Sequence, residues 1–173
     1  MEKSTYTIRK NFLLPLGLIV LLSFILLISA IYLHLPLAKI IILGIFLLPV
    51  SIIFIESSRR KVNVTSKEIE INKLFRSKKL SYAELTDIDT IQVRKRVFIS
   101  LSSENDFIII SNSYERFGQM IQQLVAAVPA NIVSEKTRQI ADNPPKKCSD
   151  IFSAWVTVAV LILIIFVQFR GTL

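Results

Sequence analysis

The sequence predicts a membrane protein of the α+β class, in which three transmembrane helices carry one small β-rich domain. Apolar residues make up 52% of the 173 residues and the mean hydropathy is +0.55, whereas soluble domains have about 45–50% apolar residues. The excess lies in three uncharged runs at 12–33, 40–55 and 151–169. Lys61 to Val128 lies between the second and third runs. Its apolar residues first alternate with polar ones, as in a strand, and then recur every three or four positions, as in a helix.

The first two runs are expected to form a helical hairpin over 12–56, preceded by a polar, basic tail at 1–11. A helix over Phe12 to Leu33 would be about 33 Å long, enough for a hydrocarbon core of about 30 Å. A cleaved signal peptide is the alternative, but its apolar core is only about 7–15 residues long. A break from His34 to Lys39 separates the two runs, and Lys39 can reach the interface by snorkelling.

Residues 130–150 are interpreted as a linker, because few apolar residues occur there and the Asn-Pro-Pro sequence at 143–145 stops a helix. The third predicted span covers 151–169, and Trp155 near its start is a typical interfacial anchor. Only a short tail at 170–173 follows.

Basic residues predict the orientation of these spans. Lys and Arg gather before the first span, after the second and before the third, which places the N-terminus and the domain at 59–129 in the cytoplasm. The C-terminus then lies on the opposite side of a cell inner (plasma) membrane. The net charge of +8 is explained mostly by these border positions, so nucleic acid is not an expected partner.

The domain at 59–129 is predicted to contain short strands with one face in a core. Apolar residues recur at every second position in five places: Val62 and Val64; Ile69 and Ile71; Leu80 and Tyr82; Ile91 and Val93; and Val97, Ile99 and Leu101. The unbroken run Phe107 to Ile110 predicts a strand covered on both faces. Ser103 to Asp106 is expected to form the hairpin turn before it.

A closing helix is predicted after these strands. Its apolar residues are three and four apart, at Tyr114, Phe117, Ile121, Leu124 and Val128. The serines and asparagine at 111–113 are candidate N-caps. We expect the helix face to meet Tyr82 in the core, each large side chain contributing about 1.5–3 kcal/mol of stability.

Several segments together carry a family resemblance. They are strands at 62–65 and 67–71, the step Tyr82-Ala83-Glu84-Leu85-Thr86-Asp87-Ile88, two further strands, and a helix starting Tyr114-Glu115-Arg116-Phe117. This order resembles the bacterial pleckstrin-homology (PH) like domains of small membrane proteins. The resemblance implies a bent antiparallel β-sheet or barrel closed by a C-terminal helix, in which the aromatic-x-acidic step leads from one sheet to the next.

Few residues point to catalysis. The only histidine, His34, lies in the predicted hairpin turn, across the membrane from the domain and from Cys148. Clustered metal ligands and a glycine-rich phosphate loop are both missing from the sequence. We therefore expect no enzymatic activity, no metal and no cofactor.

Two basic clusters are the candidate contact site. Their residues are Lys73, Phe75, Arg76, Lys78, Lys79, Arg94, Lys95 and Arg96. An anionic leaflet would attract each basic side chain with about 1 kcal/mol, and a protein partner is the alternative. The phosphoinositide site of eukaryotic PH domains is not carried over, because the close Arg-x-Arg pairing is missing and the cluster follows the second strand. Phe75 is expected to contact lipid, a partner or the core.

The sequence therefore favours a non-enzymatic, membrane-anchored PH-like module that presents a cytoplasmic protein- or membrane-binding surface, as an adaptor or scaffold does. Its expected partners are the lipid bilayer and another membrane or cytoplasmic protein, with a homo-oligomer as a further possibility. The alternative is a structural accessory subunit of a larger integral membrane complex, recognised through its transmembrane helices.

Overall fold

The computed structural model describes residues 4–94, 96–144 and 149–170. The chain divides into two compact units. The helical unit is drawn from residues 10–58 and 148–173, and the sheet unit from residues 1–9 and 59–147.

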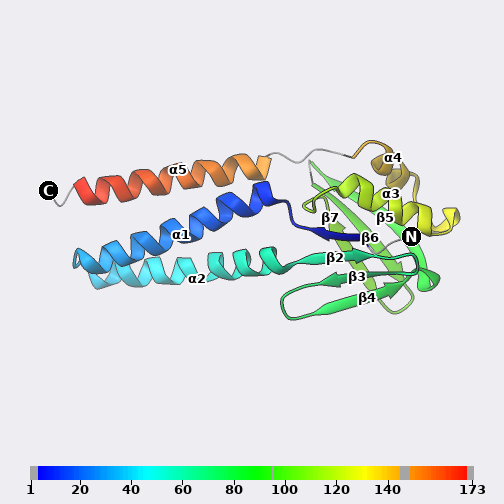
Figure 1. Ribbon diagram of the computed structural model, residues 1–173, viewed down its shortest axis with the longest axis horizontal. Coiled ribbons are helices and arrows are strands. Elements are labelled where there is room, and N and C mark those ends of the chain that lie inside the picture. Colours follow the sequence, from blue (N-terminus) through cyan, green and yellow to red (C-terminus); the bar gives the residue numbers. More distant parts are fainter. Residues whose placement is uncertain (1–3, 95, 145–148, 171–173) are drawn as a thin grey trace. The chain divides into compact units, whose positions relative to one another are not determined.

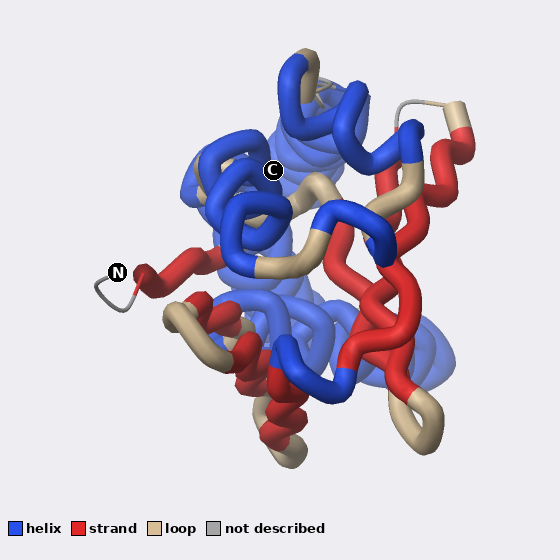
Figure 2. Tube along the Cα trace, turned by 90° about the vertical axis from the view of Figure 1, so that its right-hand side faces the viewer, coloured by secondary structure: helices blue, strands red, loops and turns tan. Residues whose placement is uncertain are grey.

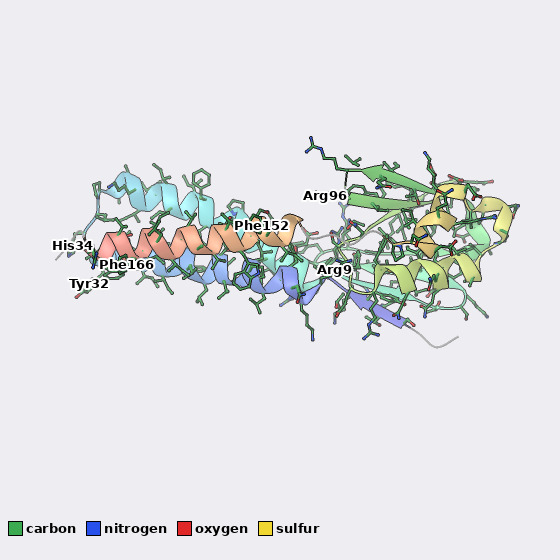
Figure 3. All side chains as sticks on the ribbon, turned by 90° about the horizontal axis from the view of Figure 1, so that it is seen from above. Arg9, Tyr32, His34, Arg96, Phe152 and Phe166 are labelled. Carbon is green, nitrogen blue, oxygen red and sulfur yellow. The ribbon has the colours of Figure 1, made fainter. Side chains whose placement is uncertain are left out.

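The helical unit contains the long apolar helices α1 (Lys10–Tyr32), α2 (Leu37–Arg59) and α5 (Ser149–Arg170) (Figure 1). Within the described residues, these three helices are long and apolar enough to cross a membrane, which agrees with the three predicted spans. α1 packs against α5, and the Gln168 amide nitrogen donates to the Ser29 hydroxyl at 3.1 Å. Figure 3 shows Tyr32 and His34, at the turn between α1 and α2, at one end of this unit.

The first sheet of the sheet unit is antiparallel, with strands in the order β1-β2-β3-β4. Its strands are β1 (Ser4–Thr7), β2 (Lys61–Val64), β3 (Glu68–Asn72) and β4 (Ser77–Ser81). The expectation that residues 1–11 form only a tail is wrong, because β1 lies within them. β1 pairs with β2, although α1 and α2 lie between these two strands in the sequence. The physical reason is burial, because Tyr6 and Ile8 are only 6% and 5% exposed.

A short 3-10 helix (Tyr82–Glu84) connects β4 to a second antiparallel sheet, with strands in the order β5-β6-β7. Its strands are β5 (Leu85–Val93), β6 (Arg96–Ser103) and β7 (Phe107–Ser111). Figure 2 shows the two sheets as separate groups of strands. In the part of the chain that the structure describes, they do not join into a closed barrel.

Most of the alternating residues are buried as predicted, but two expectations about the second sheet are wrong. Ile91 and Val93 are 55% and 56% exposed, because the inward positions of β5 after its bulge at Leu85/Asp87 belong to Ile88 and Thr90. β7 is not covered on both faces: Ile108 and Ile110 are buried, whereas Phe107 and Ile109 are 58% and 50% exposed. Among the described strands, β7 pairs with β6 alone, and the exposure of Phe107 and Ile109 shows that its outer face is partly open.

The closing helix α3 (Phe117–Ala127) packs Phe117, Met120, Ile121 and Leu124 into the core. It begins three positions later than predicted, at Phe117, because Arg116 adopts a left-handed conformation with φ 51°. Tyr114 instead forms an isolated bridge with Ile8. The predicted N-cap at 111–113 is therefore wrong, since the N-cap residue is Arg116, whose side chain makes no capping hydrogen bond.

The predicted linker at 130–150 is in large part folded onto the second sheet. A short 3-10 helix (Ala130–Ile132) leads to α4 (Glu135–Asp142), and the Ser134 N–H donates to the Ile88 carbonyl at 2.9 Å. The hydroxyls of Thr137 and Thr90, both buried, lie 2.8 Å apart. Val133, only 6% exposed, also forms an isolated bridge with Ile88. Backbone and hydroxyl contacts with few apolar side chains hold this segment, which explains why the scarcity of apolar residues predicts a linker.

Candidate binding groove

A groove of about 770 Å³ separates β7 from the end of the first sheet at which β2 begins, β3 ends and β4 begins. Its size is that of a typical ligand site, about 300–1,000 Å³. The residues that line it are Arg60, Ile71, Lys73, Phe75, Arg76, Ser77, Lys78, Phe98, Phe107, Ile108, Ile109, Ser111 and Tyr114. One wall is thus mainly basic and the other is the apolar β7.

The edge of β7 that faces away from β6 has unused backbone groups. The Asn112 N–H donates to the Val97 carbonyl, and the Ser103 N–H donates to the Asp106 carbonyl. With the register of the two strands, these bonds identify Ile108 and Ile110 as the residues of β7 that bond to β6. Because bonding alternates along an antiparallel pair, the N–H and C=O groups of Ile109 and Ser111 point away from β6. In the described residues no strand pairs with them, so this edge can accept hydrogen bonds from, and donate them to, an added strand.

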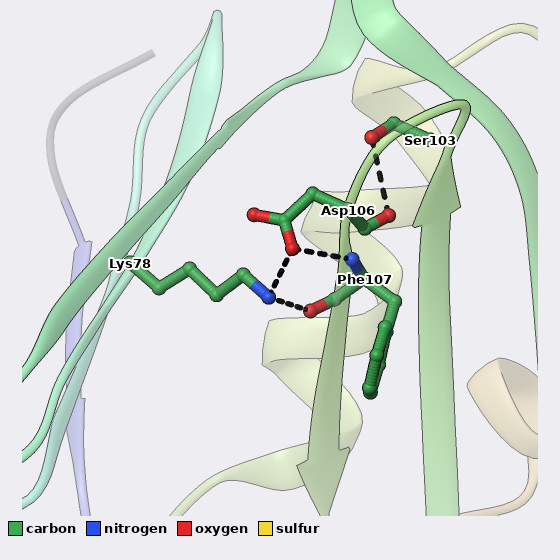
Figure 4. Close-up of polar contacts among 4 residues, drawn as sticks. All are labelled: Lys78, Ser103, Asp106 and Phe107. Carbon is green, nitrogen blue, oxygen red and sulfur yellow. Dashed lines mark hydrogen bonds and ion pairs between the residues drawn. The ribbon is translucent and has the colours of Figure 1, made fainter.

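Lys78, one of the lining residues, links the basic wall to the β7 side of the groove (Figure 4). Its ammonium contacts the Asp106 carboxylate and the Phe107 carbonyl, and it lies 4.9 Å from the centroid of the Phe107 ring. The hydrogen bond from Lys78 holds the pKa of Asp106 below its usual value, helped by the Phe107 N–H. This contact joins β4 to the turn before β7, where the two sheets approach each other.

The remaining cations of the groove are not neutralised by acidic lining residues. Arg60, Lys73 and Arg76 line it, and no Asp or Glu is among its described lining residues. The Arg60 Nε is buried, and no hydrogen-bond partner for it exists in the described part of the chain. A buried donor without a partner is unfavourable, so an anionic ligand would be stabilised beside Arg60.

The structure brings four of the eight predicted contact residues together in the groove: Lys73, Phe75, Arg76 and Lys78. Lys79 is not in the groove, and its ammonium lies 3.6 Å from the Glu70 carboxylate. Arg94 and Arg96 belong to the β5–β6 hairpin, whose end is labelled at Arg96 in Figure 3. Lys95 lies outside the described residues.

Sequence reasoning missed Arg60 and the β7 side of the groove. Arg60 belongs to the basic residues after the second apolar run, which predict only a membrane border, and the run from Phe107 to Ile110 predicts a strand covered on both faces. The sequence carries no clear signal for this side of the groove, because an unbroken apolar run does not tell a covered strand face from an open one.

The buried tyrosine of the core is separate from the groove. Burial raises the pKa of Tyr82 to about 12, with a smaller contribution from the charge of Glu68. The Tyr82 hydroxyl is buried, and the described residues offer it no hydrogen-bond partner. This phenol stays neutral at physiological pH and acts as a core residue.

The described residues contain no group of three or more His, Cys, Asp or Glu side chains that could hold a metal ion. The chain matches no family model, no curated protein and no solved structure.

Proposed function

We propose that the chain is a membrane-anchored interaction module without catalysis of its own, and that its sheet unit binds an extended segment of another protein in the groove. The observation that carries this proposal is the unpaired edge of β7, with free backbone groups at Ile109 and Ser111 beside a basic wall. Addition of a strand to an exposed sheet edge is a common mode of peptide recognition.

The charges and apolar residues of the groove define the segment. Backbone hydrogen bonds from β7 would hold it in an extended conformation, and Phe107 and Ile109 would contact its apolar side chains. Its acidic side chains would pair with Arg60 and Arg76, which line the opposite wall. We therefore expect a segment in which apolar and acidic residues alternate.

The PH-like organisation and the topology are part of the same proposal. Four strands, then three strands, then α3 support the PH-like resemblance. The basic residues at the ends of the apolar helices support an inner-membrane protein with its sheet unit in the cytoplasm. In this arrangement the helices act as the anchor and the groove acts as the adaptor surface.

Site-specific photo-crosslinking in the intact chain tests the proposal. A photoreactive side chain at Ile109, 50% exposed in the groove, is compared with one at Ile91, 55% exposed on the same sheet but outside the groove. We expect a discrete protein adduct from position 109 that Arg76→Glu abolishes, and no such adduct from position 91. Equal labelling at both positions, or lipid adducts alone at 109, would contradict the proposal. Adducts only from positions in α1, α2 or α5 would support the accessory-subunit alternative.

A further inference from the structure

The register of the first sheet places one turn beside the connections to the apolar helices. Thr7 pairs with Lys61, and Lys61 pairs with Asn72. Ile8 and Arg9 alone separate β1 from α1, and Arg60 alone separates α2 from β2. Both connections thus leave from the end of the sheet at which β3 finishes, and the β3–β4 turn projects from this same end (Figure 1).

The β3–β4 turn, defined as Lys73 to Arg76, presents an aromatic ring that the core does not use. The Lys73 N–H donates to the Arg76 carbonyl at 2.8 Å, so Leu74 and Phe75 form the tip. Phe75 is 89% exposed, more than any other large hydrophobic residue described. An exposed phenylalanine ring is unfavourable in water, and Phe is one of the residues with which interfacial segments enter the boundary between headgroups and acyl chains.

Cations lie on both sides of this ring and on the neighbouring strand. Lys73 and Arg76 flank it in the chain, and Lys61, at the start of β2, is the direct partner of Asn72, the residue before Lys73. Acidic residues are missing from both stretches concerned, 57–62 and 72–79. The charged side chains of these two stretches are therefore basic at the end of the sheet from which the turn projects, and anionic lipid headgroups attract this charge.

We propose that the β3–β4 turn is a lipid contact of the sheet unit. The Phe75 ring enters the interfacial region of the leaflet that α1 and α2 reach through their short connections, and Lys61 and Lys73 bind anionic headgroups. The contact requires no protein partner, so it goes beyond the proposed function. It would fix which end of the sheet unit faces the membrane, leaving Arg60, Arg76 and the β7 edge for the protein segment.

Tryptophan fluorescence of the full chain in lipid nanodiscs tests the contact, because both faces of a nanodisc are open to solvent. Trp155 is the only tryptophan, so the Trp155→Phe variant has no tryptophan fluorescence. Phe75→Trp is introduced into this variant as the single fluorescent probe. The matched control is Ser66→Trp, in the exposed β2–β3 turn at the other end of the five-residue β3, about 17 Å away. Nanodiscs contain anionic or zwitterionic lipids with brominated acyl chains.

We expect brominated lipid to quench the indole at 75 at least twofold more strongly than the indole at 66, and aqueous acrylamide to show the reverse order. Lys61→Gln with Lys73→Gln should reduce the lipid quenching in anionic discs to the level in zwitterionic discs. Quenching at 75 by acrylamide but not by lipid would overturn the proposal. Protection from both quenchers would also overturn it, in favour of a protein contact. The adduct at Ile109 is measured separately, so either proposal can fail alone.

Discussion

Truncation of Tyr6 tests whether the residues before the first helix belong to the sheet unit. Tyr6 is 6% exposed, and its hydroxyl donates to the Gln123 side-chain oxygen of α3 at 2.8 Å. Replacing a buried aromatic residue by alanine costs about 3–5 kcal/mol, out of a total stability of about 5–15 kcal/mol for a typical domain. A residue of an exposed tail would change stability by less than about 0.5 kcal/mol.

The variants Tyr6→Ala, Tyr6→Phe and Thr7→Ala separate the contributions. Tyr6→Ala should raise the open population of the sheet unit roughly a hundred- to several-thousandfold, because about 1.4 kcal/mol corresponds to a factor of ten. Tyr6→Phe loses only the hydrogen bond to Gln123, about 0.5–1.5 kcal/mol. Thr7→Ala is the control, since Thr7 is a partly exposed neighbour in the same strand.

Hydrogen exchange of the β2 amides in the full chain, in detergent, measures this opening. β2 pairs with β1 along its whole length, so the loss of β1 should appear there first. Protection of β2 that is equal in Tyr6→Ala and Thr7→Ala would refute the argument, and residues 4–7 would then be a tail that contributes nothing to the fold.

Three further predictions concern the core and the groove. Tyr82→Phe removes a buried hydroxyl without a partner, so we expect chemical denaturation to show about 1 kcal/mol of added stability. The raised pKa of Tyr82 favours the protonated phenol in the folded state, so wild type should lose stability relative to this variant as pH rises from about 10 towards about 12. Equal dependence of the unfolding free energy on pH in the two proteins would contradict this. Thr137→Val leaves the buried Thr90 hydroxyl unpaired and should destabilise the fold by about 1–3 kcal/mol. The double variant with Thr90→Val should recover part of this loss. If the stability changes of the two single variants simply add in the double variant, the two hydroxyls do not interact. Lys78→Met removes the main cause of the low pKa of Asp106, so titration of the Asp106 carboxyl by NMR should show a higher pKa in the variant. An unchanged pKa would mean that the contact between β4 and the turn before β7 does not form.

Periodicity predicted the parts of the fold in which burial is uniform along an element. The three long helices follow from uncharged apolar runs, and the inward residues of β2, β3, β4 and β6 follow from strict alternation. β1 was not predicted, because its pattern is only four residues long and its partner strand lies beyond two helices in the sequence. Pairing at that separation has no local signal.

The parts that were predicted wrongly depend on tertiary partners. α4 is held by hydroxyl contacts of Thr137 and Ser134, which composition does not distinguish from a polar linker. The outer face of β7 depends on whether another element covers it, and an apolar run alone does not decide this. Half of the candidate site was found because its charges cluster in one turn, whereas the β7 half required knowledge of the sheet edge.

An exposed strand edge with apolar side chains is a risk for a protein, because it can pair with a second copy of itself. In β7 this risk is opposed by charge. Arg60, Lys73, Arg76 and Lys78 line the groove beside the edge, so two chains that met through β7 would bring two sets of cations together in a desolvated site. Pairing between copies is therefore disfavoured, whereas an acidic strand would neutralise the same cations. We infer that the basic wall both protects the edge from self-association and selects its partner, so reversing Arg76 to Glu should weaken partner capture and promote association of the chain with itself.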